Sequence, residues 1–176
     1  MQNAPLGSEF DLDTFKIVTL REATCDDAPT IVAVLQAAFE EYRGRLDPPS
    51  GAHGETIEKV RDVMRTACSV LALDGDQVAG CVFYAPADEH IDLFRLAVLP
   101  AYRRRGVGRA LVEYVESRAL ALGIPRVQLG VRVALPRNRA YYERMGYRFL
   151  EARTHEGYAE PTYVILVKTL TERVKW

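Results

Sequence analysis

Apolar side chains recur every three to four positions in several stretches of the chain, and this period predicts amphipathic helices. The first long stripe follows Asp26 and Asp27, either of which can cap a helix, and it has Pro29 in its first turn. The second long stripe follows a short glycine loop and ends at Gly123. The stripes comprise Ile31, Val34, Leu35, Ala38, Phe39 and Tyr42 in the first helix and Val107, Ala110, Leu111, Tyr114, Val115, Ala119 and Leu122 in the second, and shorter helices are predicted over residues 55–66 and 138–145.

Segments that alternate between apolar and polar residues predict the strands of a sheet. Asp74-Gly75-Asp76 separates two of them and indicates a β-hairpin. The strand after the second long helix is expected to run parallel to the strand ending at Val98, because a helix connects them. The predicted strands are Phe15–Leu20, Ser69–Leu73, Gln77–Ala85, His90–Val98, Val127–Val133, Tyr147–Glu151 and Thr162–Lys168. This order predicts an α/β (α+β) fold with a mixed, mostly antiparallel sheet and helices on both faces.

Composition limits the class of protein. The 176 residues suit one domain, expected over residues 14–176, after a flexible leader or cloning remnant over residues 1–13. The net charge of −1 argues against a general nucleic-acid binder, and no apolar run is long enough to predict a membrane span. Cys25, Cys68 and Cys81 lack metal-ligand spacing, so neither a zinc site nor a disulfide is expected, and the chain is expected in the cytoplasm. Cys68 and Cys81 are both expected in the core.

A glycine loop, Arg103–Gly108, stands between the strand ending at Val98 and the second long helix. Glycines let backbone N–H groups approach an anion closely, and the helix dipole adds to the attraction. Five arginines and no acidic residue lie between Arg95 and Arg109. The pattern predicts a site for a phosphorylated ligand, although it is neither a Walker P-loop nor a dinucleotide fingerprint. The alternative is an ordinary helix start with a solvated basic edge.

The loop Arg103–Gly108 and the stretch Asn138–Tyr147 together resemble the GNAT superfamily of acyl-CoA-dependent N-acyltransferases. The first fits the family's Gln/Arg-x-x-Gly-x-Gly/Ala loop, and the second resembles its Asn…Tyr-Glu-x-x-Gly-Phe/Tyr segment. The resemblance implies a single domain of about seven strands, splayed between the fourth and fifth strands, after Val98. It also implies transfer of an acetyl group from acetyl-CoA to a primary amine, without a metal.

The resemblance implies specific roles for residues of this chain. Tyr142 would protonate the departing thiolate as the catalytic acid, and Asn138 would bond the pantetheine arm. The other residues implied to bind acetyl-CoA are Leu96, Ala97, Val98, Arg103, Arg104, Arg105, Gly106, Val107, Gly108 and Arg109. The acceptor would be a small molecule or a peptide, with no nucleic acid or membrane as partner, and the chain could form a homodimer. A non-catalytic acyl-CoA sensor or scaffold is the alternative.

Several assignments stay open from the sequence. Tyr141 and Tyr142 are adjacent, and only one of them is expected to face the thioester, because neighbouring helical residues point about 100° apart. The base that accepts the amine proton is not identified. The acids and histidine considered for it are Glu89, His90 and Asp92 at the start of the central strand and Glu40 and Glu41 at the end of the first helix. The loops 45–54 and 153–161 could cover an acceptor or could be ordinary connections.

Overall fold

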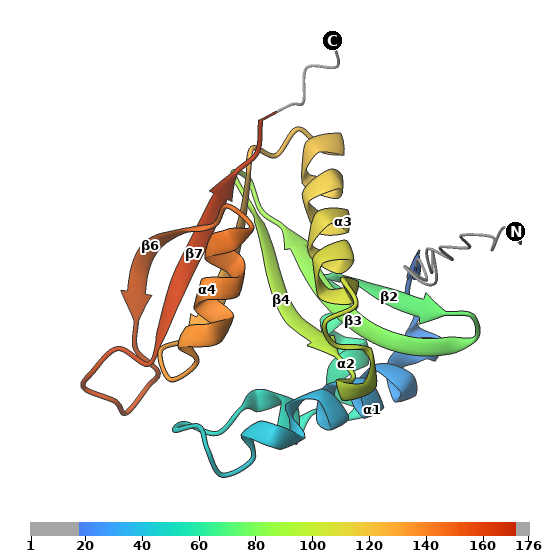
Figure 1. Ribbon diagram of the computed structural model, residues 1–176, viewed down its shortest axis with the longest axis horizontal. Helices are drawn as coiled ribbons and strands as arrows, with labels where there is room; N and C mark the ends of the chain where they lie inside the picture. Colours follow the sequence, from blue (N-terminus) through green and yellow to red (C-terminus); the bar gives the residue numbers. More distant parts are fainter. Residues whose placement is uncertain (1–17, 172–176) are drawn as a thin grey trace, which may run out of the picture.

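The computed structural model describes residues 18–171 (Figure 1). Along the chain, the strands and α-helices follow the predicted order. They are β1 (Thr19–Glu22), α1 (Ala28–Phe39), α2 (Ile57–Val63), β2 (Cys68–Asp74), β3 (Gln77–Pro86), β4 (Ile91–Val98), α3 (Val107–Ala121), β5 (Arg126–Arg132), α4 (Pro136–Arg144), β6 (Arg148–Arg153) and β7 (Tyr163–Thr169). The 3-10 turns are η1 (Cys25–Asp27), η2 (Glu40–Tyr42), η3 (Gly51–Gly54) and η4 (Pro100–Tyr102).

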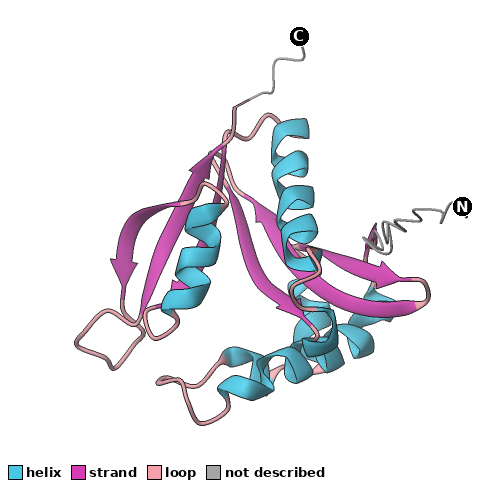
Figure 2. Cartoon of the chain, in the orientation of Figure 1, coloured by secondary structure: helices cyan, strands magenta, loops and turns pink. Residues whose placement is uncertain are grey.

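The strands form one seven-stranded sheet in the order β1-β2-β3-β4-β5-β7-β6. The pair β4–β5 is parallel, as predicted, and the other neighbouring pairs are antiparallel. The helices lie on both faces of this sheet (Figure 2). The mixed, mostly antiparallel sheet with helices on both faces is therefore confirmed.

Two apolar cores hold the layers together. On one face, α3 buries Leu111, Val112 and Val115 against the middle strands, and Tyr142 of α4 packs at the border of this core. On the other face, α1 and α2 cover Phe83 and other side chains of β2–β4. The sheet is thus fixed on both sides in its first half, where α1, α2 and α3 all pack on it.

The splay between β4 and β5 begins earlier than predicted. The two strands pair only from Ile91 to Leu93, opposite Val127 to Leu129. From Phe94 onward they separate, and the sheet opens toward the end of α1 (Figure 1). The prediction that they part after Val98 is wrong: the pairing with β5 ends at Leu93, just before the point where the pairing of β4 with β3 shifts register.

Some local predictions also need correction. Cys68 was expected in the core, but it is the first residue of β2 and is exposed. Cys81 is buried as expected, and all three cysteines are free thiols. Helix α1 ends at Phe39 and continues to Tyr42 as a 3-10 turn, and the expected loop 45–54 contains a second such turn. The first strand was predicted over Phe15–Leu20. It starts at Thr19, and residues 15–17 lie outside the described part, as does the leader 1–13.

Candidate active site

The second half of β4 offers an open backbone edge. Its pairing with β3 shifts register between Cys81 and Phe83, opposite the stretch from Phe94 to Ala97. Arg95 marks this bulge with a φ of 51°, in the left-handed region. Because β5 has already separated, the edge of β4 that faces β5 is unpaired within residues 18–171 from Phe94 onward. An extended ligand chain can therefore bond to β4 as an added strand would.

The glycine loop supplies N–H groups at the end of this edge. Arg104 and Gly106 have φ values of 62° and 77°, so the loop turns sharply before α3. Ala110 donates its N–H to the Gly106 carbonyl (2.9 Å) and closes the first turn of the helix. The N–H groups of Val107 and Gly108 precede this bond and belong to the unpaired first turn of an α-helix. Together with the helix dipole they form a fitting cradle for phosphate oxygens.

Arg103 is engaged by the protein itself. Its Nη2 donates to the Ala38 carbonyl (2.8 Å), its Nη1 pairs with Glu41 (2.6 Å), and its Nε donates to the Val98 carbonyl (3.3 Å). These contacts tie the loop to the end of α1 and to the end of β4. The side chain therefore positions the loop, and each of its three guanidinium nitrogens has an acceptor within the protein.

The remaining arginines of this stretch divide between protein contacts and solvent. Arg109 pairs with Glu113 on the surface of α3 (3.2 Å), and the guanidinium of Arg105 lies over the ring of Tyr102. Arg104 is exposed. The arginine-rich stretch 95–109, which contains no acidic residue, is thus partly neutralised by Glu41 just after α1 and by Glu113 on α3. Its positive charge remains mainly at Arg104 and Arg105.

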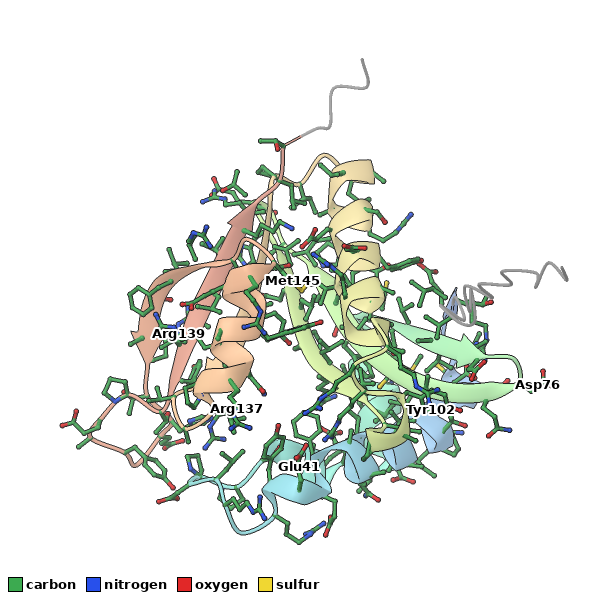
Figure 3. All side chains as sticks on the ribbon, viewed as in Figure 1. Glu41, Asp76, Tyr102, Arg137, Arg139 and Met145 are labelled. Atoms are coloured by element: carbon green, nitrogen blue, oxygen red, sulfur yellow. The ribbon has the colours of Figure 1, made fainter. Side chains whose placement is uncertain are left out.

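A cavity of about 440 Å³ lies between α1, the glycine loop and α4. Its lining includes Arg137 at the start of α4, Glu41 on the segment after α1 and Tyr102 on the segment after β4 (Figure 3). Among the predicted residues, Leu96, Ala97, Val98, Arg103, Arg104, Val107, Gly108, Asn138 and Tyr142 line this cavity, whereas Arg105, Gly106 and Arg109 are not among its lining residues. Sequence reasoning did not identify four further lining residues as part of a site, and it assigned the first two to the apolar stripe of a helix: Phe39, Tyr42, Tyr102 and Arg137. The only feature of the sequence that could have identified Tyr102 and Arg137 is their position next to the two motifs, directly before Arg103 and Asn138.

Both tyrosines of α4 border this cavity. The rings of Tyr141 and Tyr142 meet edge to face, with centroids 5.2 Å apart, and Tyr142 makes a similar contact with Tyr147. An added Cβ on Gly108 would lie 3.1 Å from the Tyr141 hydroxyl, so that hydroxyl sits against the start of α3. Burial raises the pKa of Tyr142, with smaller effects from Tyr141 and Tyr42. Tyr142 is therefore protonated at neutral pH.

A second cavity of about 130 Å³ lies in the splay between β4 and β5. Four residues line both cavities: Phe39, Leu96, Asn138 and Tyr142. The two cavities thus adjoin at the residues implied to bond the pantetheine arm and to supply the acid. Leu135 and the ends of β4 and β5 complete the smaller cavity.

The two long loops meet beside the smaller cavity. Tyr158 donates its hydroxyl to Asp47, and Arg132 donates Nη2 to the Pro48 carbonyl (2.6 Å). In addition, His53 Nε2 lies 2.8 Å from the Phe39 carbonyl, which fixes the first loop to the end of α1. The loops 45–54 and 153–161 therefore form one connected wall rather than two independent connections.

The residues considered as bases lie elsewhere or are paired. Glu89 pairs with Arg126 (2.6 Å) and His90 with Asp92 (3.2 Å), all near the closed end of the β4–β5 pair and outside both cavities. Glu41 does line the larger cavity, but it is bound to Arg103. Within residues 18–171 no group of three or more His, Cys, Asp or Glu side chains could hold a metal ion. No helix in the same range is long and apolar enough to cross a membrane.

Comparisons with known proteins were made for the chain. The model of the Acetyltransferase (GNAT) family matches residues 31–147. An amino-acid acetyltransferase of Pseudomonas syringae pv. syringae is 37% identical over 113 residues, which are 57% of this chain and 26% of that protein. A Bos taurus protein named "Probable N-acetyltransferase 14" is 37% identical over 108 residues, 59% of this chain and 48% of that protein. The chain thus spans about a quarter to a half of these relatives.

The fold is also found among solved structures. The PaiA N-acetyltransferase of Thermoplasma acidophilum, solved in complex with coenzyme A, superposes with a TM-score of 0.72 at 17% identity. The match covers 87% of this chain and 99% of that one. At this identity the likeness establishes the shared fold.

Proposed function

Because the chain belongs to the acetyltransferase (GNAT) family, we propose that it transfers an acetyl group from acetyl-CoA to a primary amine. The observation that carries the proposal is the pair of adjoining cavities, which share Asn138 and Tyr142. The larger cavity has the features of a donor site, and the smaller, adjoining cavity offers space for an acceptor. Such an arrangement suits direct transfer, in which two substrates meet without a covalent enzyme intermediate.

The donor site fits acetyl-CoA on three observations. The unpaired edge of β4 offers backbone groups to an amide-containing arm. The first turn of α3 offers N–H groups to phosphate oxygens. Gly108 leaves room beside Tyr141, where a Cβ would already be 3.1 Å from the hydroxyl. When bound, acetyl-CoA supplies the activated thioester; Arg103 holds the loop in place, while Arg104 and Arg105 provide the positive field.

Tyr142 is proposed as the acid. Its phenol is at the junction of the cavities, and burial keeps its proton on by raising its pKa. The same apolar surroundings disfavour a free thiolate, so the departing sulfur gains from a nearby proton donor. The amine must lose a proton as well. Since no acidic side chain of the described residues lines the smaller cavity, we propose that water carries this proton away.

Release of free thiol from acetyl-CoA, measured against a panel of amines, tests the activity. Tyr142→Phe is expected to lower kcat about 10²-fold and to change the Kd of CoA little, because only the hydroxyl is lost. Tyr114→Phe is the matched control, since its hydroxyl bonds to Glu22 and it lines neither cavity. A 10²-fold loss in Tyr141→Phe instead would assign the acid to Tyr141. If CoA binds but no amine yields thiol, the chain is a sensor and the proposal fails.

A further inference from the structure

The smaller cavity has an unusual combination of side chains for an amine site. Most of its lining is apolar, as at Phe94, Leu129 and Val131. Its charged members are two arginines, Arg95 of β4 and Arg132 at the end of β5. Within residues 18–171, no aspartate or glutamate lines it. A cationic acceptor such as a polyamine would meet like charge there, whereas an anionic group would be attracted.

Each of the two arginines retains a buried nitrogen without a partner. Arg95 binds Glu55 through Nη2, while its Nη1 is buried and unbonded. Arg132 donates Nη2 to the Pro48 carbonyl (2.6 Å), while its Nε is buried and unbonded. Leaving a buried charged donor without an acceptor costs more free energy than leaving a neutral one, because its desolvation is not compensated. Both nitrogens are covered by protein in this structure, and a carboxylate that enters the cavity and shifts the two side chains slightly would supply the missing acceptor oxygens.

Neighbouring charges assign the larger share of this attraction to Arg132. Glu55 is buried and neutralises much of the charge of Arg95, with one of its own oxygens left unpartnered. Burial lowers the pKa of Arg132, and the nearby Tyr158 and Asp47 offset this only in part; Asp47 also accepts a hydrogen bond from the Tyr158 hydroxyl. Arg95, whose charge is offset by a direct ion pair with Glu55, is therefore the more nearly neutral of the two, and Arg132 contributes more of the positive charge at the cavity.

We infer that the acceptor is a small amine that also carries a carboxylate, with the carboxylate held at Arg132 and Arg95 and an apolar part against the strand side chains. This inference rests on the proposed acetyl transfer. It also explains how the amine becomes reactive: positive charge nearby lowers the pKa of the acceptor's ammonium group, so a larger fraction is neutral and able to attack. Tyr142 and Asn138 lie at the other border of the same cavity, toward the donor.

Matched amines test the inference. The probes are L-leucine, L-leucinamide and 3-methylbutylamine, and the corresponding series L-phenylalanine, L-phenylalaninamide and 2-phenylethylamine. In each series kcat/KM, measured by thiol release, is expected to be at least about tenfold higher for the carboxylate, since one charge-assisted contact is worth about 1.5–3 kcal/mol. An amide or plain amine that is used equally well or better in both series would overturn the inference.

Variants of Arg132 connect the preference to the cavity. Arg132→Met is expected to raise the KM for the carboxylate about tenfold or more and to leave the KM for the amide within about twofold. Arg132→Lys should restore part of the preference. Arg65→Met is the control for loss of a surface arginine, because Arg65 is exposed and lines neither cavity. Tyr158→Phe is the control for the loop wall, since it breaks the bond to Asp47 without removing an arginine. Equal losses for carboxylate and amide in Arg132→Met would also overturn the inference.

A separate measurement distinguishes this inference from the proposed function. If no amine releases thiol, the proposed acetyl transfer fails, and calorimetry of the CoA-loaded protein with L-leucine and L-leucinamide decides about the carboxylate site. Binding of L-leucine that is at least tenfold tighter and that weakens in Arg132→Met supports the site. Equal binding of the two, or binding of neither, refutes it.

Discussion

Replacement of Arg103 by methionine should lower the free energy of unfolding. It should have little direct effect on the affinity for CoA. The guanidinium bonds to the Ala38 carbonyl at 2.8 Å, to Glu41 at 2.6 Å and to the Val98 carbonyl at 3.3 Å. A hydrogen bond from a charged group contributes about 1.5–3 kcal/mol, and partial exposure lowers this value. The ion pair adds at most about 1 kcal/mol, because the two side chains are 36% and 42% exposed.

The expected loss is therefore about 2 kcal/mol in the free energy of unfolding. For a domain of this size, that corresponds to a fall of about 4–8 °C in the midpoint of thermal unfolding. Arg104→Met is the matched comparison, since Arg104 is exposed at the same loop. It should leave the unfolding midpoint unchanged and weaken CoA binding, in a manner that depends on salt.

Urea unfolding and calorimetric titration with CoA measure the two effects separately. Glu41→Gln, combined with Arg103→Met in a double-mutant cycle, should give a coupling of at most about 1 kcal/mol. If Arg103→Met leaves the free energy of unfolding within about 0.5 kcal/mol of the wild-type value but weakens CoA binding tenfold, Arg103 is a phosphate ligand and the reasoning is wrong.

Three further predictions concern other parts of the chain. Gly80→Ala would place a Cβ 2.5 Å from the Ala97 carbonyl oxygen of β4, so it should cost about 1–3 kcal/mol of stability and weaken CoA binding. Gly51→Ala is the control, because an added Cβ meets open space there and should change neither quantity. Urea unfolding measures the stability of both variants, and calorimetry measures their CoA binding. Because burial raises the pKa of Tyr142, kcat/KM should increase with pH as the acceptor amine deprotonates, without a decline below about pH 9.5. A decline of kcat/KM with a midpoint near pH 8 would exclude Tyr142 as the acid. Asp27→Ala should lower the free energy of unfolding by about 1 kcal/mol at pH 7, because the hydrogen-bonded, partly exposed Arg21 lowers the pKa of Asp27 to about 2. This stabilisation is complete above the ordinary aspartate pKa and is lost as the pH falls through about 2. An equal cost at pH 2 and pH 7 in urea unfolding would contradict the assignment.

Local patterns along the chain predicted the order of the elements well. Ile31, Val34, Leu35 and Ala38 of the first stripe are buried on α1, and Val107, Leu111, Val115 and Ala119 of the second are buried on α3. Leu122, predicted on the same face, lies just after the end of α3 and is half exposed. Gly106, which the sequence placed before the helix, adopts the left-handed conformation that its turn requires. These features depend on residues a few positions apart, and their period can be read directly from the sequence.

The partners of the charged side chains could not be predicted in this way. The resemblance implied that Arg103 helps to surround the phosphates of acetyl-CoA, but it gave no sign that its guanidinium also bonds to the Ala38 carbonyl, 65 residues away in the chain. Likewise, Arg95 and Arg132 are separated by the whole of α3, and only the splay of β4 from β5 brings them to one cavity. A charged side chain can pair with any opposite charge that the fold brings near, so composition does not identify its partner.

The sequence by itself determined the strand–glycine loop–helix unit, because backbone conformation there follows from glycines and from the local apolar period. It also determined, through two motifs, which family the chain resembles. Only the tertiary structure decided where the sheet opens, which arginines face a ligand space, and that Tyr142 stands between two cavities. The physical reason is that cavities and ion pairs form between elements far apart in the chain, where packing rather than local preference sets the distances.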